Sequence, residues 1–262
     1  MSQPTLTPSQ PPLLGSPQEG QRGVRTLPPP PSASKTPGWR PTAPSRASRT
    51  VSRRSKRSGR VTIVTTDAPR RIHCESFLEA KVAYVLLARP DIVDVTEQPP
   101  PVPYQDEAGR TRTHFFDFRV TRSDGTRVAI AVKPAKVVRR RKLRELLHRI
   151  AAAMPPSYAD AVLLVTEEDL SLALVHNAML IHSVRRGRCA DHDARVAALV
   201  RTLNGRVTVG TLVEVLGLAG DGFRAVVRAI ADGTLTVRGR GRIAYDSWVA
   251  PASLAAADGE AT

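Results

Sequence analysis

The sequence predicts an α/β core, a mixed sheet flanked by helices, between a disordered basic N-terminal tail and a helical C-terminal domain. Three observations predict this organisation. Strand-like and helical apolar patterns alternate over residues 61–186. Proline and arginine dominate residues 1–60. Short helical patterns separated by glycine fill residues 187–250, and a small-residue segment at 251–262 predicts a flexible C-terminal tail.

Residues 1–60 contain 12 of the 22 prolines and 11 Lys or Arg against one acid, Glu19. Such a segment buries too little apolar surface to offset its ordering entropy, so we expect it to be disordered. It carries +10 of the net charge of +15, concentrated in residues 53–60. This basic run would neutralise DNA phosphates without reading sequence, although a solvated linker explains it equally well.

The first predicted helix of the core spans residues 75–89 and ends before Pro90. Its apolar positions are Leu78, Val82, Val85 and Leu86. Glu79 lies at the inward edge of this stripe, where an unpaired carboxylate is costly to desolvate. Either Glu79 is partly exposed and pairs with an arginine, or it binds a metal, and Glu75 shares its face.

A strand over residues 92–95 is followed by a surface crossing rich in proline and then by two strands, 113–120 and 127–132. Asp124-Gly125 between the last two strands predicts a tight hairpin turn. The side-chain facing of this hairpin depends on the length of its loop.

A two-residue turn would set Asp117 opposite Val132 and send Lys133 to the other face. A three-residue loop or one bulge would set Asp117 opposite Lys133 on one face. In that register, the small side chains of Ala129 and Ala131 leave space above the sheet beside the acid and the lysine.

An acid on a helix, an acid on one strand and a lysine ending the next are the parts of a metal-dependent DNA-cutting site. A divalent cation needs carboxylate oxygens, and a nearby positive charge stabilises the phosphorane-like oxyanion. The alternative is that Lys133 is an ordinary lysine at the end of a strand, with its ammonium group in water. Aspartate is disfavoured in strands, so Asp117 between two phenylalanines is harder to explain as an ordinary strand residue.

A second helix is predicted over residues 139–153, and its exposed basic cluster is expected to bind DNA. The cluster consists of Arg139, Arg140, Arg141 and Lys142. Residues 161–165 predict a fully buried strand, parallel to its neighbour because a helix connects them. Thr166 to Asp169 has the spacing of a capping box and predicts a helix extending to about Arg185.

The C-terminal region predicts helices over residues 191–203 and 208–216, a helix capped by Asp221, and a strand over 234–237. Two short helices across a glycine turn followed by a strand resemble a winged helix-turn-helix, and a generic helical accessory domain is the alternative. In the winged-helix interpretation Arg224 and Arg228 face DNA.

A cytoplasmic protein is expected, because no apolar run reaches the roughly 18 residues of a membrane span and no signal-peptide core is present. Cys74 and Cys189 form no CxxC motif, which fits a reducing compartment.

The ordered motifs resemble the TnsA-type endonuclease subunit of heteromeric transposases, a branch of the PD-(D/E)xK restriction-endonuclease-like superfamily. The resemblance covers residues 70–186, and the C-terminal region looks like that family's winged-helix-like domain. The matching pieces are residues 76–79, 94–99, 116–118, 129–134 and 163–168.

The resemblance implies that Glu79 is the helix acid of the metal site, Asp117 the central ligand, and Lys133 the residue that orients the attacking water. The Val132 carbonyl would add a ligand to Mg²⁺ or Mn²⁺. Ala131 departs from the family, which has Gln or Glu there, and losing such a contact costs about 10- to 100-fold in metal affinity or activity.

The expected function is therefore a Mg²⁺-dependent DNA endonuclease that cuts one strand at transposon ends. The resemblance also implies a partner transposase and an ATP-dependent regulator, and no membrane partner. Two alternatives stay open: a catalytically impaired DNA-binding assembly subunit, and a standalone restriction-like nuclease.

Overall fold

A computed structural model describes residues 42–49 and 59–257 of the chain. Most of the predicted disordered tail, and residues 258–262 of the predicted C-terminal tail, lie outside the described residues. Residues 42–49, by contrast, form specific contacts with the core, which corrects the prediction of a disordered tail there. In the described ranges, no helix is long and apolar enough to cross a membrane.

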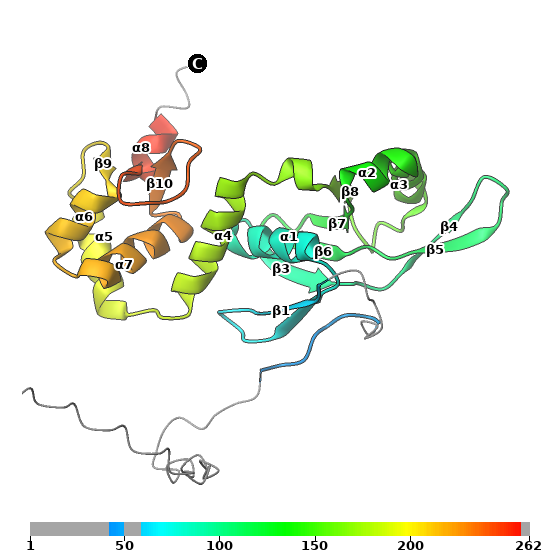
Figure 1. The fold of residues 1–262 in the computed structure, drawn as a ribbon, viewed down its shortest axis with the longest axis horizontal. Coiled ribbons are helices and arrows are strands. Elements are labelled where there is room, and N and C mark those ends of the chain that lie inside the picture. The colour runs from blue at the N-terminus through cyan, green and yellow to red at the C-terminus, as the bar shows by residue number, and fades with distance from the viewer. Residues whose placement is uncertain (1–41, 50–58, 258–262) are drawn as a thin grey trace, which may run out of the picture. The chain divides into compact units, whose positions relative to one another are not determined.

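A mixed four-stranded sheet forms the centre of the core and confirms the predicted α/β class (Figure 1). Its strands in spatial order are β3 (Ile92–Glu97), β6 (Phe118–Arg122), β7 (Arg127–Val132) and β8 (Ala161–Val165). β3, β6 and β7 pair antiparallel, whereas β8 pairs parallel to β7, as predicted. The expected full burial of β8 is wrong because β8 is the edge strand, and Leu163 is 47% exposed.

Helices cover both faces of this sheet. On one face α1 (Phe77–Ala88) packs against Ile130 and Val132, and on the other α3 (Leu143–Ala153) packs against Ala129 and Ala131. The predicted space above the two alanines is therefore absent: Leu143, Leu147 and Ile150 belong to the same apolar cluster. Both faces of β7 are buried, which explains its nearly continuous apolar sequence.

The predicted helix over residues 139–153 is two helices. α2 (Ala135–Arg140) ends at Arg141, and Lys142 has a φ of 48°, a left-handed conformation that interrupts the helical path before α3. The capping box of Thr166 with Asp169 is present, but it closes only the 3₁₀ turn η1 (Glu167–Asp169). α4 (Leu172–Arg185) begins separately at the N-cap Ser171.

Two hairpins were not predicted. β1 (Val61–Val64) pairs with β2 (Arg71–Cys74), and β4 (Val102–Gln105) pairs with β5 (Thr111–His114). The strand predicted over residues 113–120 is consequently interrupted: β5 belongs to its own hairpin, and β6 begins only at Phe118. Asp117 lies in the bend between them.

The C-terminal region has its own apolar core. Its elements are α5 (Ala190–Val200), β9 (Val207–Thr208), α6 (Val209–Leu216), α7 (Ala219–Ala231), β10 (Leu235–Arg238), β11 (Trp248–Pro251) and α8 (Ala252–Ala257). The three strands form a sheet in the order β10-β11-β9. Asp221 does not cap α7, because the helix already begins after Leu218, and the predicted flexible tail is helical at α8.

Candidate active site

The backbone around Asp117 fixes its carboxylate beside the end of β7. Its N–H donates to the Ile130 carbonyl at 2.9 Å, and its carbonyl accepts the Gln98 N–H at 2.8 Å. The side-chain Oδ2 accepts the Val132 N–H at 2.6 Å. The buried carboxylate therefore accepts a hydrogen bond from a backbone N–H of β7, and this bond holds it in place.

Lys133 continues β7, and its N–H donates to the Val165 carbonyl at 3.1 Å. Its Nζ lies 2.9 Å from Oδ2 and 3.2 Å from Oδ1 of Asp117. The structure thus brings together the strand acid and the lysine predicted from the sequence. The Lys133 side chain remains 35% exposed, so its ammonium group reaches both Asp117 and solvent.

The register of this hairpin is neither of the two considered from the sequence. Arg122 donates its N–H to the Thr126 carbonyl across a three-residue loop, and Phe118 pairs with Ile130. Asp117 lies in the bend before β6 and also donates its N–H to Ile130, and Phe116 and Phe118 belong to opposite core clusters. The strand alternation is therefore interrupted at Asp117, and the contact with Lys133 depends on this irregularity and on the long lysine side chain.

Glu79 sits in the first turn of α1, where Ser76 is the N-cap. Its Oε1 accepts the Ser76 hydroxyl at 2.9 Å, and its Oε2 accepts the Glu75 N–H at 2.7 Å. Glu75 precedes the helix, so it does not share the helical face of Glu79 as predicted. The expected arginine partner is not among the described contacts of Glu79.

Electrostatic interactions link Glu79 to Asp117 and Lys133. Burial raises the pKa of Glu79, and the negative charge of Asp117 raises it further. The hydrogen bonds from Glu75 and Ser76 and the charge of Lys133 act in the opposite direction on this pKa. Two buried carboxylates and one ammonium group therefore share one electrostatic environment.

Two further residues of this environment, Cys74 and His114, were not predicted. Burial raises the pKa of the Cys74 thiol to about 12, and the charges of Glu79, Glu97 and Asp117 contribute. Burial also lowers the pKa of His114, and Lys133 adds to that shift. No sequence signal distinguishes these residues, because their burial results from packing between elements far apart in the chain.

Gln98 is a further unpredicted neighbour of Asp117. It is 1% exposed, has a φ of 39°, and bonds to the Asp117 carbonyl through its backbone. In the described part of the chain, neither Nε2 nor Oε1 of its amide has a hydrogen-bond partner. Unpaired buried amides are rare in folded proteins, and they call for a structural or functional reason.

The side chains of Ala131 and Val132 provide no oxygen ligand for the metal that the resemblance implies. Ala131 is 1% exposed in the cluster under α3 and offers no oxygen. The Val132 side chain lies in the opposite core, while its N–H binds Asp117. The Val132 carbonyl as a metal ligand stays a prediction.

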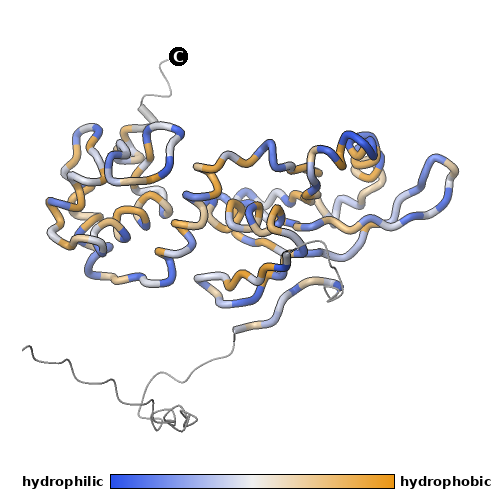
Figure 2. Tube along the Cα trace, in the orientation of Figure 1, coloured by the Kyte–Doolittle hydropathy of each residue, from blue (hydrophilic) through white to orange (hydrophobic). Residues whose placement is uncertain are grey.

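The predicted basic cluster, at the end of α2 and in the connection to α3, is exposed, and Figure 2 shows this part of the chain in hydrophilic colours. Only one of its four cations has a described ion pair, between Arg139 and Glu168 at 3.1 Å. The exposed position suits a DNA contact, which stays a prediction.

The prediction that Arg228 faces DNA is wrong. Arg228 is 2% exposed, and its Nε donates to Asp193 at 2.7 Å. Its Nη1 donates to the carbonyls of Val184 and Gly187. Arg224, one turn earlier on α7, is exposed and remains available for DNA.

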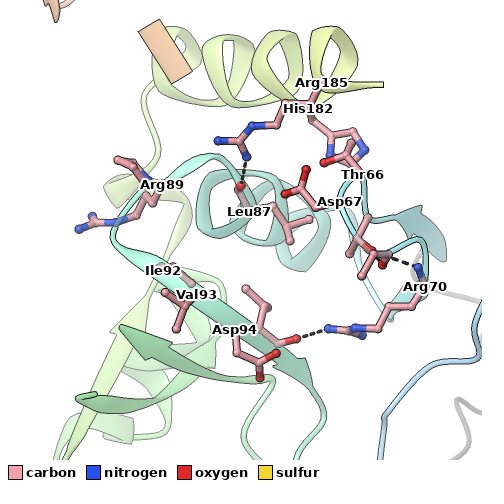
Figure 3. Close-up of a pocket in the computed structure, with 14 residues that line it drawn as sticks. Thr66, Asp67, Arg70, Leu87, Arg89, Ile92, Val93, Asp94, His182 and Arg185 are labelled. Carbon is pink, nitrogen blue, oxygen red and sulfur yellow. Dashed lines mark hydrogen bonds between the residues drawn. The ribbon is translucent and has the colours of Figure 1, made fainter. Parts of the chain in front are cut away.

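A separate pocket of about 330 Å³ lies between the β1–β2 connection, α1, β3 and α4 (Figure 3). Its lining does not include Glu79, Asp117 or Lys133. Two of its arginines are already bonded: Arg70 to the Val95 carbonyl and Arg185 to the Leu87 carbonyl. This pocket is thus distinct from the candidate site.

Part of the chain matches a known family. Residues 89–156 match the family described as TnsA-like endonuclease N terminal. The match begins directly after α1 and extends past the end of α3, so it includes Asp117 and Lys133 but not Glu79. A comparison with curated proteins finds no match. Residues 89–156 are thus similar to the N-terminal domain of TnsA-like endonucleases, the family that the ordered motifs predicted.

Proposed function

We propose that the protein is a Mg²⁺-dependent DNA endonuclease with a restriction-endonuclease-like core, which cuts one strand at transposon ends together with a partner transposase. The observation that carries this proposal is the 2.9 Å contact of Lys133 Nζ with Asp117 Oδ2, whose charges also act on the buried Glu79. The family match supports a nuclease related to transposition.

The donor set fits a metal that is bound together with substrate. Within residues 42–49 and 59–257, no three His, Cys, Asp or Glu side chains gather into a metal site. Mg²⁺, however, usually binds through one or two carboxylates, with waters and substrate phosphates completing its shell. Glu79 and Asp117 supply hard oxygen atoms, and a cation would relieve the repulsion that raises the Glu79 pKa. These two residues would hold Mg²⁺ or Mn²⁺.

Phosphodiester hydrolysis adds a water oxygen to phosphorus and breaks the bond to the leaving oxygen, which takes up a proton. When bound, the metal would supply Lewis-acid polarisation and a more acidic water. Lys133 would donate a hydrogen bond to the attacking water or to a non-bridging phosphate oxygen. Asp117 positions the ammonium group through the described contact.

The C-terminal elements support a winged-helix interpretation. Their order is helix, strand, two helices and two strands, with the three strands in one sheet. Arg224 is exposed on the second of the paired helices, and Arg240 and Arg242 are exposed between β10 and β11. In this proposal α7 and the β10–β11 connection contact DNA.

One observation favours a second candidate, a DNA-binding assembly subunit with an impaired nuclease. Ala131 supplies no oxygen, and the apolar side chains of α3 fill its surroundings. A standalone restriction-like nuclease differs from both only in its independence from a transposase.

The test is cleavage of supercoiled plasmid and transposon-end DNA with Mg²⁺ or Mn²⁺, with and without the transposase. Asp117→Asn should abolish cleavage. Asp160→Asn is the matched control, because Asp160 also accepts a backbone N–H of β7, from Arg127 at 2.7 Å, at the opposite end of the strand. Nicking by the native protein and Asp160→Asn alone supports the proposal. Intact DNA binding without any cleavage would establish the assembly subunit, and cleavage without transposase the standalone enzyme.

A further inference from the structure

Residues 42–49, which we name the N-terminal strap, are held against β2 and the end of β3. Ala43 forms a parallel bridge with Arg70, and its carbonyl accepts the Arg71 N–H at 2.9 Å. Ser48 donates its N–H and its hydroxyl to the Gln98 carbonyl, both at 2.9 Å. The strap is thus attached at both ends through backbone groups of the core.

Glu97 anchors the middle of the strap. This carboxylate is 0% exposed and accepts the Ser45 hydroxyl at 2.6 Å, the Arg46 N–H at 2.9 Å and Arg70 Nη1 at 2.7 Å. A buried carboxylate is tolerated only when its oxygens are bonded. Since two of the three donors belong to the strap, the strap is part of the folded core.

Arg49, the last described residue of the strap, lies near the candidate active site. Arg49 Nη2 donates to Glu75 Oε2 at 2.8 Å, and the Arg49 guanidinium carbon lies 5.3 Å from the centroid of the Phe115 ring. The Glu75 N–H binds Glu79, and Phe115 is two residues before Asp117. Arg49 therefore joins the two segments that carry the candidate metal-binding acids.

The geometry of Arg49 is suited to an anion. An aromatic ring and a carboxylate orient its planar guanidinium group, so little freedom is lost when another ligand binds. A guanidinium has five N–H donors, and in the described part of the chain only Nη2 of Arg49 has a hydrogen-bond partner. The side chain is 40% exposed and therefore accessible.

A DNA phosphate that approaches Glu79 and Asp117 meets two negative charges, so positive charge at the edge of the site favours its entry. We propose that Arg49 contacts a backbone phosphate of DNA at this site, and that the N-terminal strap is part of the DNA-binding surface of the core. This inference rests on the proposed nuclease function, but it concerns binding and can be measured apart from cleavage.

The test compares Arg49→Ala with Arg46→Ala in the full chain. Arg46 is the matched control because it belongs to the same strap and is similarly exposed, but its guanidinium binds Asp94 at 2.5 Å, on β3. Binding of labelled duplex DNA is measured by fluorescence anisotropy in Ca²⁺ over a series of salt concentrations. One lost phosphate contact should lower the salt slope by about 0.9 and weaken binding about tenfold for Arg49→Ala alone.

Arg49→Lys separates charge from geometry: it should restore part of the salt slope but not the full affinity, because lysine lacks the planar fork. Thermal unfolding shows whether each variant keeps the fold. Equal binding by the two alanine variants would overturn the inference, and tighter binding by Arg49→Ala would show that Arg49 shields the site. If the native protein does not cleave DNA but Arg49→Ala still weakens binding, the nuclease proposal fails and the phosphate contact stands.

Discussion

Arg228 should stabilise the fold, and Arg224 should bind DNA, although the two residues are one helical turn apart on α7. Replacing Arg228 with Met keeps most of the apolar stem and removes three hydrogen bonds, to Asp193, Val184 and Gly187. The first is short and charge-assisted, whereas the other two, at 3.4 and 3.3 Å, are weak.

The magnitude follows from burial. Breaking a buried ion pair costs about 3–5 kcal/mol, because the remaining charge is left without a partner. The Asp193 side chain is 27% exposed and can regain water, so the lower end of that range, about 3 kcal/mol, applies. For a folded unit of about 150–250 residues, this corresponds to a fall in Tm of about 6–12 °C.

The assay is thermal unfolding followed by circular dichroism, together with DNA binding by anisotropy. Arg224→Met is the control, since an exposed substitution should change stability by less than about 0.5 kcal/mol and yet weaken DNA binding. An Arg228→Met protein with native Tm and reduced DNA affinity would refute the reasoning, because Arg228 would then have to reach DNA.

Three further predictions concern the candidate site. The pKa of Glu79 is raised in the folded state, so the stability that this carboxyl contributes is present below its unfolded-state pKa and is lost as the pH rises through its folded-state pKa. In EDTA, Glu79→Gln should therefore be more stable than the native protein at neutral pH but not below about pH 4. Urea unfolding over a series of pH values checks this. With its pKa at about 12 and its side chain buried, Cys74 should not react with a thiol reagent in the native state, whereas the half-buried Cys189 should, as peptide mapping after labelling would reveal. Gln98→Leu should be neutral or stabilising by about 1 kcal/mol in urea unfolding, because it removes a buried amide without partners, and a clear loss of stability would contradict that.

The neighbourhood of Asp117 and Lys133 was predictable because the two residues lie at the same end of two strands that a short hairpin joins. The facing of Asp117 was not predictable, because this residue lies in a bend before β6 where the strand alternation is interrupted. Glu79 was predictable because an acid on an apolar helical stripe needs a chemical explanation, and in the structure it is buried and the charge of Asp117 raises its pKa.

The roles of Arg228 and of the N-terminal strap were not predictable, because both depend on contacts distant in sequence. Helical periodicity assigns Arg224 and Arg228 to similar faces, but α5 carries Asp193 to Arg228 alone. The composition of the strap is that of the surrounding tail. Its order depends on Glu97, a buried acid whose requirement for donors does not appear in the local pattern of β3.

Ala131 has a consequence for how the candidate site would work. The cluster under α3 encloses this position, so β7 cannot supply a third side-chain oxygen without disturbing that packing. Two carboxylates then leave most of the coordination shell of Mg²⁺ to water and to phosphate. A site of this kind binds its metal weakly until DNA is present, so metal binding and DNA binding reinforce each other. In the proposed nuclease, positive charge from Lys133 and Arg49 would contribute to catalysis by attracting the phosphate that completes the metal shell.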